Sequence, residues 1–402
     1  MSLLNPDGYY FFDVTHWENG EPQMRCDWRE GAPKIYHTRD FTTGGDYYYL
    51  EFKEGEAFRK TQLRHILAPE VLRAIKDHNS DTYLIVNNSH EAFLSCVEPI
   101  YRYLIMGHNI PTHKLILISG AFDIEEEIER VRPMYKKDAI KVELSLDFED
   151  NTVSTLQAQV HEGTFTPPRT MVDKVYDKAF INFNRRWRVH RPTFVALLKH
   201  RNLLDRGFVS LAPADDHMTW EDGWKSIVTM NQDFPWIVSI AYDLKDELLS
   251  MPPLYLDTDD LVTNRANLQD STNYLYEQSY FSVVSETNFY TCHSGYEASK
   301  FLSEKAFKPI LYKHPFIFIS TPGTLSCLKQ IGYKTFDGLI DESYDTIADD
   351  GERMLAVLNE VERLSNLSPQ EVSDFVNQAR DICSYNYRVL FNKTKFQHRL
   401  NY

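Results

Sequence analysis

Short apolar runs alternate with longer amphipathic segments over most of the chain. In the first half, the apolar runs at 82–88, 114–120 and 140–146 are the predicted strands. The segment 89–107 has apolar residues at helical spacing, and Gly107 is the residue at which such a helix is expected to end. Strands that alternate with helices are typical of α/β architecture with largely parallel sheets.

The pattern restarts in the second half, after a polar stretch at 160–174 that contains two consecutive prolines and is interpreted as a linker. The predicted strands beyond it are 178–184, 207–212, 236–242, 280–286 and 315–320. A short helix is expected between the last strand and Gly332. A long helix is expected to begin at Ser368, with Glu371 completing a capping box. The chain is therefore predicted to be an α/β protein of two domains with a helical C-terminal segment.

Length and charge limit the number of domains and the kinds of partner that the chain can have. A chain of 402 residues suits two domains of ordinary size, which we place at 1–172 and 173–375, with a helical segment at 376–402 that can pack back on the first domain. The 43 Lys and Arg residues are outnumbered by 58 Asp and Glu residues, so the formal net charge is -15. Because affinity for nucleic acids comes from cations that neutralise phosphates, this balance argues against a nucleic-acid partner. A phosphate-binding role would have to depend on a local basic cluster.

Cysteine usage and the first residues indicate the compartment. The five cysteines are scattered and form no C-x-x-C pair, which is typical of a reduced intracellular protein without structural zinc. The N-terminal stretch has neither the basic region nor the sustained apolar region of a secretion signal. No apolar run approaches the roughly 18–20 residues of a membrane span. We therefore expect a soluble, cytoplasmic protein without a membrane-spanning segment.

A basic cluster follows the predicted strand 178–184. This strand ends at Asn184, and a helix is expected to begin near Pro192, because proline suits a first helical turn. The arginines between them are Arg185, Arg186, Arg188 and Arg191. An anion here would meet backbone N–H groups, the positive helix end and guanidinium groups together, at the sheet edge where ligands of α/β proteins bind. The arginine cluster therefore has two interpretations: it binds a diphosphate, or it is a solvated basic loop without a binding function.

A second candidate site lies between the last two predicted strands. Ser303 can cap a helix whose first turn would contain Glu304 and Lys305. The lysine adds positive charge where backbone donors are free, and the glutamate is suited to accept hydrogen bonds from sugar hydroxyl groups. Taken alone, the same pair is also what an ordinary solvated helix start contains.

These stretches resemble one enzyme family. The sequences YFSVVSETNF (280–289) and FLSEKAFKPILYKHPFIFIS (301–320) resemble the donor-binding region of α1,3-fucosyltransferases. NRRWRVHRPTFVAL (184–197) resembles the start of the helix whose arginine holds the donor diphosphate in that family. The longer stretch 303–345 is similar to proteins assigned as glycosyltransferases in marine viruses and bacteria.

The resemblance implies a GT-B fold, in which two Rossmann-like domains face each other across a cleft and the C-terminal domain binds the donor. The implied reaction moves a sugar from a nucleotide-diphosphate sugar to a hydroxyl group of a glycan or glycoprotein acceptor. It needs neither a metal nor a further cofactor, and GDP-fucose is the first guess for the donor. The sequence departs from the family pattern at two points: Thr287 replaces the family's asparagine, and the gap between Glu286 and Glu304 is longer. These departures argue against GDP-fucose in particular and do not argue against nucleotide-sugars in general.

The resemblance also implies roles for individual residues. By matching position, Arg191 would contact the donor diphosphate and Lys305 a phosphate. Glu304 would contact the ribose or the donor sugar, and Glu286 would line the same pocket. With Asn184, Arg185 and Arg186 from the basic cluster added, the predicted donor-site residues are Asn184, Arg185, Arg186, Arg191, Glu286, Glu304 and Lys305.

The attacking acceptor hydroxyl needs a base, which in the inverting GT-B pattern comes from the N-terminal domain at a strand end. The predicted strand 82–88 is followed by His90 and Glu91; Glu91 is the preferred candidate for the catalytic base, and His90 is the second. Asp123, after the next strand, is a fallback. A helix start capped by Ser89 would contain the same residues without any catalytic role, and a retaining reaction would need no such base.

Alternatives to a metal-free transferase are open. Asp257 and Asp259 have the D-x-D spacing that holds a divalent metal against a nucleotide diphosphate in other glycosyltransferases. A second acidic stretch contains Asp215, Asp216 and His217. Both stretches are interpreted as polar loops, so no metal site is expected. The other function classes are a non-catalytic nucleotide-sugar or carbohydrate-binding protein and a nucleotide-sugar epimerase, since a fold does not fix the chemistry.

Overall fold

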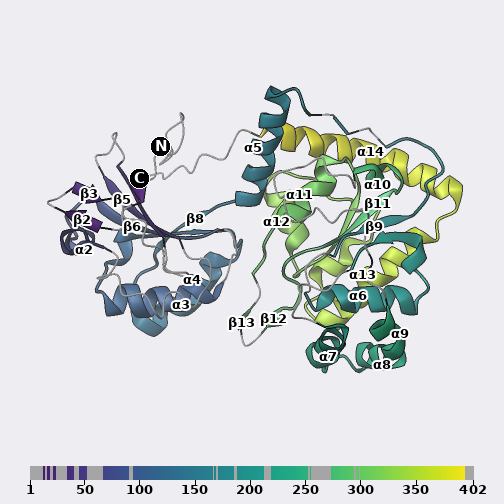
Figure 1. Cartoon of the computed structure of the whole chain (residues 1–402), viewed down its shortest axis with the longest axis horizontal. Coiled ribbons are helices and arrows are strands. Elements are labelled where there is room, and N and C mark those ends of the chain that lie inside the picture. Colours follow the sequence, from purple (N-terminus) through teal and green to yellow (C-terminus); the bar gives the residue numbers. More distant parts are fainter. Residues whose placement is uncertain are drawn as a thin grey trace. The chain divides into compact units, whose positions relative to one another are not determined.

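The chain forms two compact units, which are described separately (Figure 1). Unit 1 contains Met1–Asp147, Cys292–Phe301 and Phe396–Tyr402, and unit 2 contains Phe148–Thr291 and Leu302–Lys395. The computed structural model describes residues 12–13, 16–18, 21–23, 34–39, 45–51, 67–89, 94–165, 167–168, 171–184, 188–211, 219–251, 254, 273–293, 296–297 and 299–393. The domain division at 172 and 375 stays a prediction.

Unit 1 is built on a six-stranded sheet with the strand order β1-β4-β5-β6-β7-β8. The strands are β1 (Phe12–Asp13), β4 (Lys34–Arg39), β5 (Asp46–Glu51), β6 (Thr82–Asn88), β7 (Leu115–Ser119) and β8 (Lys141–Leu144). β5 to β8 are parallel, whereas β1 and β4 pair in the antiparallel direction. Almost every side chain of β6 and β7 is buried, which is why uninterrupted apolar runs mark these parallel strands. The strands predicted at 82–88, 114–120 and 140–146 are confirmed.

Helices cover this sheet. They are α2 (Pro69–Lys76), η2 (Leu94–Cys96), α3 (Val97–Pro99), η3 (Ile100–Gly107), η4 (Thr112–Lys114) and α4 (Ile124–Tyr135). The predicted helix 89–107 is confirmed over Leu94–Gly107, where η2, α3 and η3 follow one another without a break. η3 is wound more widely than an α-helix; just beyond it, the N–H of His108 donates to the carbonyl of Tyr103, five residues earlier. α3 and α4 contact each other and lie on one side of the sheet (Figure 1).

Two short hairpins also belong to unit 1. One pairs β2 (His16–Glu18) with β3 (Glu21–Gln23), and the other pairs β12 (Cys292–His293) with β13 (Tyr296–Glu297). Residues far apart in the sequence thus contribute to one unit.

Unit 2 contains a four-stranded parallel sheet with the order β10-β9-β11-β14. The strands are β9 (Phe180–Asn182), β10 (Gly207–Val209), β11 (Phe281–Ser285) and β14 (Phe316–Ile319). They confirm the strands predicted at 178–184, 207–212, 280–286 and 315–320. β9 and β10 approach so closely that a Cβ atom on Gly207 would lie 2.3 Å from the ring of Phe180. The fold is therefore mixed α/β with parallel strands in both units, as two Rossmann-like domains require.

The strand predicted at 236–242 is wrong, because this run forms helix α8 (Pro235–Asp243). Pro235 occupies the first turn of the helix, where its missing N–H costs nothing. Ile237 and Ala241, four residues apart, are buried together against Ile227. Helical spacing of the contacts with a neighbouring helix thus outweighs the strand preference of the β-branched residues.

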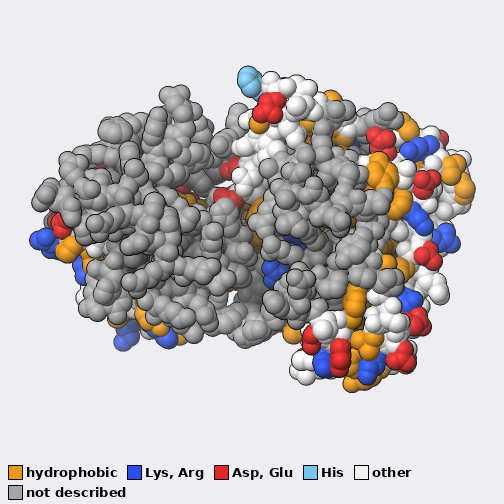
Figure 2. Space-filling model, in the orientation of Figure 1, with side chains coloured by type: hydrophobic (Ala, Val, Ile, Leu, Met, Phe, Trp, Pro, Cys, Tyr) orange, Lys and Arg blue, Asp and Glu red, His pale blue; other side chains and the backbone are white. Residues whose placement is uncertain are grey.

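Ten helices and two short 3₁₀ turns complete the described part of unit 2. They are α5 (Asp147–His161), α6 (His190–His200), η5 (Leu204–Arg206), α7 (Trp220–Met230), α8, α9 (Lys245–Ser250), α10 (Asn273–Glu277), α11 (Glu304–Leu311), α12 (Thr324–Gln330), η6 (Glu342–Thr346), α13 (Asp350–Ser365) and α14 (Pro369–Asn392). α6 contacts α13, α11 contacts α14, and the two pairs flank the sheet from opposite sides (Figure 1). Acidic, basic and hydrophobic side chains are interspersed over α7–α9 (Figure 2).

Helix ends follow the signals in the sequence. α14 begins after Ser368, whose side chain and that of Glu371 form the predicted capping box. α12 is followed by Gly332 in the left-handed region, with φ 98°, which confirms the predicted stop. The predicted linker at 160–174 is correct only beyond His161, where α5 ends; its described residues from there on contain neither helix nor strand. Across the described residues, no helix combines the length and the apolar character needed to cross a membrane.

Candidate functional site

Polar side chains gather at the carboxyl edge of the unit 2 sheet. Asn182 and Asn184 end or follow β9, and Ser285 and Glu286 end or follow β11. Helices α6 and α11 begin at the same edge, so their positive ends face these residues. This is the edge at which open α/β sheets bind ligands.

Glu286 is the centre of this cluster and is fully buried. Its carboxylate accepts hydrogen bonds from the Ser303 hydroxyl at 2.6 Å, from the Ser303 N–H at 3.2 Å and from the Thr287 N–H at 3.0 Å. Burial raises the pKa of Glu286, while Lys305 and the bond from Ser303 act in the opposite direction. A buried carboxylate with three donors and a nearby cation is held in one fixed position.

Lys305 lies at the start of α11, next to this cluster. Ser303 caps the helix, as predicted, by accepting from the Lys305 N–H at 3.3 Å. The Lys305 ammonium lies 3.0 Å from the Ser303 hydroxyl, 3.4 Å from that of Thr287 and 2.8 Å from the Glu304 carboxylate. Its side chain is 28% exposed, so the ammonium can reach a ligand from a held position. Although burial acts to raise the pKa of Glu304, Lys305 and Arg191 lower it overall.

The start of α6 supplies two buried side chains. Arg191 donates from Nη2 to the carbonyls of Ser285 and Glu286, at 3.2 and 3.3 Å. The His190 Nε2 lies 2.9 Å from the same Glu286 carbonyl, and the ring stacks on Phe289. Burial, followed by the charge of Arg191, lowers the pKa of His190 well below 6.5, so the imidazole is neutral and donates from Nε2. Arg191 and Lys305 therefore meet at one residue, Arg191 at the Glu286 carbonyl and Lys305 through Ser303 at its carboxylate.

The asparagines connect three strands of the sheet. The Asn182 amide donates to the Val283 carbonyl at 2.8 Å and to the Ser285 hydroxyl at 3.1 Å. Asn184 donates from its side chain to Asn182 and from its backbone to the Ser210 hydroxyl at 3.0 Å. The side-chain oxygen of Asn184 is buried and accepts no hydrogen bond from the described residues. Asn184 thus joins the ends of β9 and β10 next to the cluster.

The next helix along this edge, α12, is closed to anions by the chain itself. The Asp345 carboxylate accepts from the Leu325 N–H at 3.1 Å, and the Asp345 carbonyl accepts from the Gly323 N–H at 2.7 Å. Burial raises the pKa of Asp345, and bonds from the N–H groups of this helix start oppose that effect. The positive end of α12 is therefore occupied by a carboxylate, in contrast to the cationic starts of α6 and α11.

The structure brings together five of the predicted site residues, and their roles stay predictions. These five are Asn184, Arg191, Glu286, Glu304 and Lys305. Arg185 and Arg186 of the donor site, and both candidate bases, Glu91 and His90, lie outside the described residues. The metal-binding alternatives also lie there; they are Asp215, Asp216, His217, Asp257 and Asp259.

A polar cluster at the carboxyl edge of the unit 1 sheet was not predicted from the sequence. The Asp147 carboxylate, three residues after the end of β8, accepts hydrogen bonds from the hydroxyls of Ser89 and Ser145. Its position just after the predicted strand 140–146 is the signal that could have identified it. His190 and Ser303 as partners of Glu286, and Asn182 as a partner of Ser285, were likewise not predicted, because these contacts join residues far apart in the sequence.

Asp123, the fallback base, has a structural role within unit 1. Its two carboxylate oxygens accept from the Lys300 N–H at 3.2 and 3.1 Å, and burial raises the pKa of the carboxyl group. Replacing Asp123 by alanine is expected to lower the free energy of unfolding of unit 1 by about 1–2 kcal/mol, since the partly buried Lys300 N–H then loses its acceptor. Urea unfolding monitored by hydrogen exchange measures this loss. The exposed Glu126→Gln is the matched control on α4, and an equal loss there would contradict the assignment.

The chain matches none of the protein-family models and none of the curated protein sequences with which it was compared. Among the described residues, no three His, Cys, Asp or Glu side chains are grouped so that they could hold a metal ion. The chemistry of the unit 2 cluster is that of an anion site next to hydroxyl-binding groups. Its cations and helix ends suit phosphate oxygens, and the carboxylate of Glu304 suits ligand hydroxyls.

Proposed function

We propose that the protein is a glycosyltransferase that binds the diphosphate of a nucleotide-sugar at the carboxyl edge of the unit 2 sheet. One observation carries the proposal: Arg191 and Lys305, from the starts of two different helices, converge on the single residue Glu286. Two cations held at one residue, Arg191 at its carbonyl and Lys305 through Ser303 at its carboxylate, are suited to neutralise the charge of a diphosphate leaving group. On the same sheet edge, the start of α12 is occupied by the Asp345 carboxylate. This supports placing the diphosphate at the starts of α6 and α11.

In the proposed reaction, the acceptor hydroxyl oxygen forms a bond to the anomeric carbon of the sugar. The bond from that carbon to the diphosphate oxygen breaks, and its electron pair leaves with the nucleoside diphosphate. Lys305 and Arg191 stabilise the charge that develops on the diphosphate, and Glu304 accepts from ribose or sugar hydroxyls. GDP-fucose is the first donor to test, and a glycan hydroxyl is the acceptor, within a fold of the GT-B type.

The hydroxyl proton goes to a base if the anomeric configuration is inverted. Glu91 and His90 stay the predictions for this base. We add Asp147 as a candidate, because its carboxylate is held by two serine hydroxyls at the edge of the unit 1 sheet that corresponds to the donor edge of unit 2.

A donor screen tests the proposed function. The full chain is incubated with GDP-, UDP-, CMP- and dTDP-linked sugars, with and without EDTA, while the thermal midpoint and the released nucleotide are measured. A true donor at 100 times its Kd is expected to add about 2.7 kcal/mol to the stability of the folded chain by mass action. We expect slow release of nucleotide that EDTA does not change.

The outcomes of this screen separate the function classes. Stabilisation without nucleotide release, even with glycan acceptors present, would favour the non-catalytic binding protein. Interconversion of the sugar while it stays attached to its nucleotide would favour the epimerase. If no nucleotide-sugar shifts the thermal midpoint at millimolar concentration, the proposed function is wrong.

A further inference from the structure

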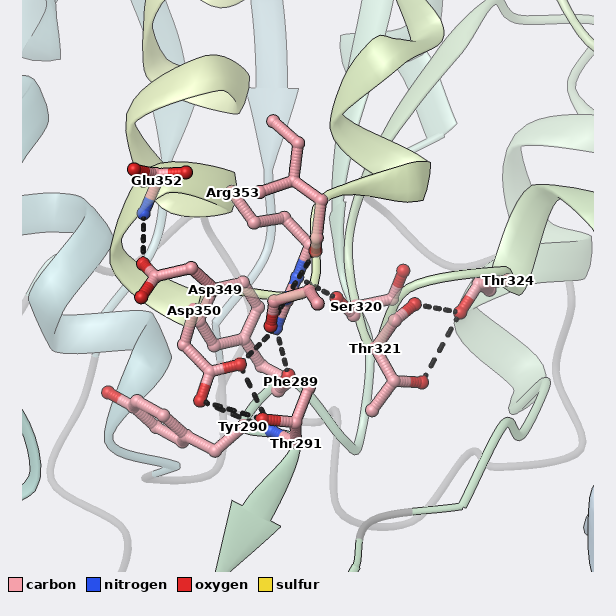
Figure 3. A network of polar contacts seen from close by, with 12 residues as sticks. Phe289, Tyr290, Thr291, Ser320, Thr321, Thr324, Asp349, Asp350, Glu352 and Arg353 are labelled. Carbon is pink, nitrogen blue, oxygen red and sulfur yellow. Dashed lines mark hydrogen bonds and ion pairs between the residues drawn. The ribbon is translucent and has the colours of Figure 1, made fainter.

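A buried arginine on α13 joins the carboxyl ends of β11 and β14 (Figure 3). Arg353 is 1% exposed. Its Nε donates to the Ser320 carbonyl, directly after β14, at 3.0 Å, and its Nη2 donates to the Phe289 carbonyl, beyond β11, at 2.6 Å. One guanidinium group therefore spans two neighbouring strand ends at the edge where the candidate site lies.

Every N–H group of this guanidinium has an acceptor. Nη1 donates to the carbonyls of Ile347 and Ala348, at 2.8 and 3.1 Å, and Nη2 also donates to the Asp350 carboxylate at 2.5 Å. The guanidinium carbon lies 4.5 Å above the ring of Phe289. Lysine offers three donors on a flexible stem and cannot reproduce this planar set of five. The site is thus specific for arginine.

Asp350 extends the contact to the segment that follows β11. Its carboxylate accepts from the Thr291 N–H at 3.0 Å, so Arg353 and Asp350 together hold Phe289 and Thr291 (Figure 3). In the middle of the same segment, the Asn288 carbonyl accepts from the Thr321 N–H at 3.2 Å. The far half of Glu286–Thr291 is therefore fixed at several backbone groups.

The near half of this segment belongs to the candidate site. Glu286 binds Ser303, and the Thr287 hydroxyl lies 3.4 Å from the Lys305 ammonium. The six residues from Glu286 to Thr291 contain no helix or strand, so their position depends on what holds their ends. Thr287 lies between Glu286, which its own hydrogen bonds hold, and the segment that Arg353 and Asp350 hold, so moving Phe289 and Thr291 would move Thr287 and with it a partner of Lys305.

We propose that Arg353, with Asp350, is a positioning residue of the donor site. It fixes the Glu286–Thr291 segment, so that Glu286 and Thr287 hold Lys305 where a diphosphate binds. This inference rests on the proposed function, and it adds a residue that does not itself touch the ligand. Burying a guanidinium has a large desolvation cost that an apolar side chain would avoid, so the five directed hydrogen bonds serve to specify geometry more than to add stability.

The test compares Arg353→Lys and Asp350→Asn with Leu358→Ala, a buried residue of the same helix outside this network. GDP binding is measured by calorimetry at a temperature where all variants are folded, and amide hydrogen exchange is followed in 286–291 and 303–306. We expect each of the first two variants to weaken GDP binding by about tenfold, since small displacements of a binding group have large effects. Exchange in both segments should rise. Leu358→Ala should lower the thermal midpoint and leave GDP affinity and exchange in 303–306 unchanged.

The two readouts separate the two ideas. A GDP affinity within twofold of the original chain in both Arg353→Lys and Asp350→Asn would overturn the positioning role. So would equal weakening by Leu358→Ala, because loss of stability alone would then explain the result. If the original chain binds neither GDP nor any other nucleoside diphosphate, the proposed function fails. Exchange in 303–306 then decides whether Arg353 controls the position of Lys305, and unchanged exchange there overturns that control as well.

Discussion

Replacing Lys305 by methionine is expected to weaken the binding of the nucleoside diphosphate by about 10- to 100-fold. A hydrogen bond to a charged group contributes about 1.5–3 kcal/mol, and each 1.4 kcal/mol is about a factor of ten in Kd. Methionine keeps an unbranched chain of similar length, so the packing of the stem against the start of α11 is retained. The difference in affinity between the original chain and Lys305→Met should become smaller at about 1 M salt, because salt screens charge interactions at partly exposed sites. Calorimetric titration with GDP, or with the donor found in the screen, measures the change.

Lys329→Met is the matched control for this prediction. Lys329 lies on α12 of the same unit, has a side chain that is 52% exposed, and faces Glu342 at 3.5 Å. This variant removes the same unit charge away from the cluster, and it should change the affinity by less than about twofold. Equal weakening by both variants would assign the effect to net charge, and an unchanged affinity in Lys305→Met would remove this lysine from the site.

The sheet strands could be predicted because both sheets are largely parallel. Strands buried on both faces need nearly continuous apolar runs, so TYLIVNN and PFIFIS identified β6 and β14 almost to the residue. The same rule failed for WIVSIAY, where an apolar run lies in a helix that contacts other helices. All are short apolar runs, and apart from Pro235 at the start of α8 they are distinguished by their packing partners, which are distant in the sequence.

The candidate site was predictable to the extent that it depends on local signals. A serine followed by Glu304 and Lys305 marks a helix start, and Ser303 does cap α11. The geometry of the site depends on long-range contacts, such as those of Arg353 with Phe289 and of Ser303 with Glu286. No local sequence pattern contains these contacts. The closed start of α12 shows the converse, because a distant carboxylate, Asp345, fills a helix end that looks open in the sequence.

Acidification from pH 6.5 to pH 4 is expected to lower the free energy of unfolding of unit 2 by about 3 kcal/mol through His314 alone. His314 is buried, with Nδ1 accepting from the Ser282 hydroxyl at 2.7 Å and Nε2 donating to the Ser279 carbonyl at 3.0 Å. Burial lowers the pKa of His314 from 6.5 to about 4. The unfolded chain therefore takes up the proton first, so the stability that is fully present above pH 6.5 is lost as the pH falls towards 4. Urea unfolding followed by fluorescence at several pH values measures this slope.

His314→Gln isolates this effect from the other titrating groups. The glutamine amide can accept from Ser282 and donate to Ser279, yet it does not titrate, so the variant should be less stable at pH 7 and should lose about 3 kcal/mol less between pH 6.5 and 4. His190, whose pKa is also lowered, contributes in the same direction in both chains. Glu286 acts in the opposite direction, because its raised pKa means that stability is lost as the pH rises. Both contributions cancel in the comparison. Parallel pH profiles of the two chains would therefore show that His314 is not buried in the neutral state.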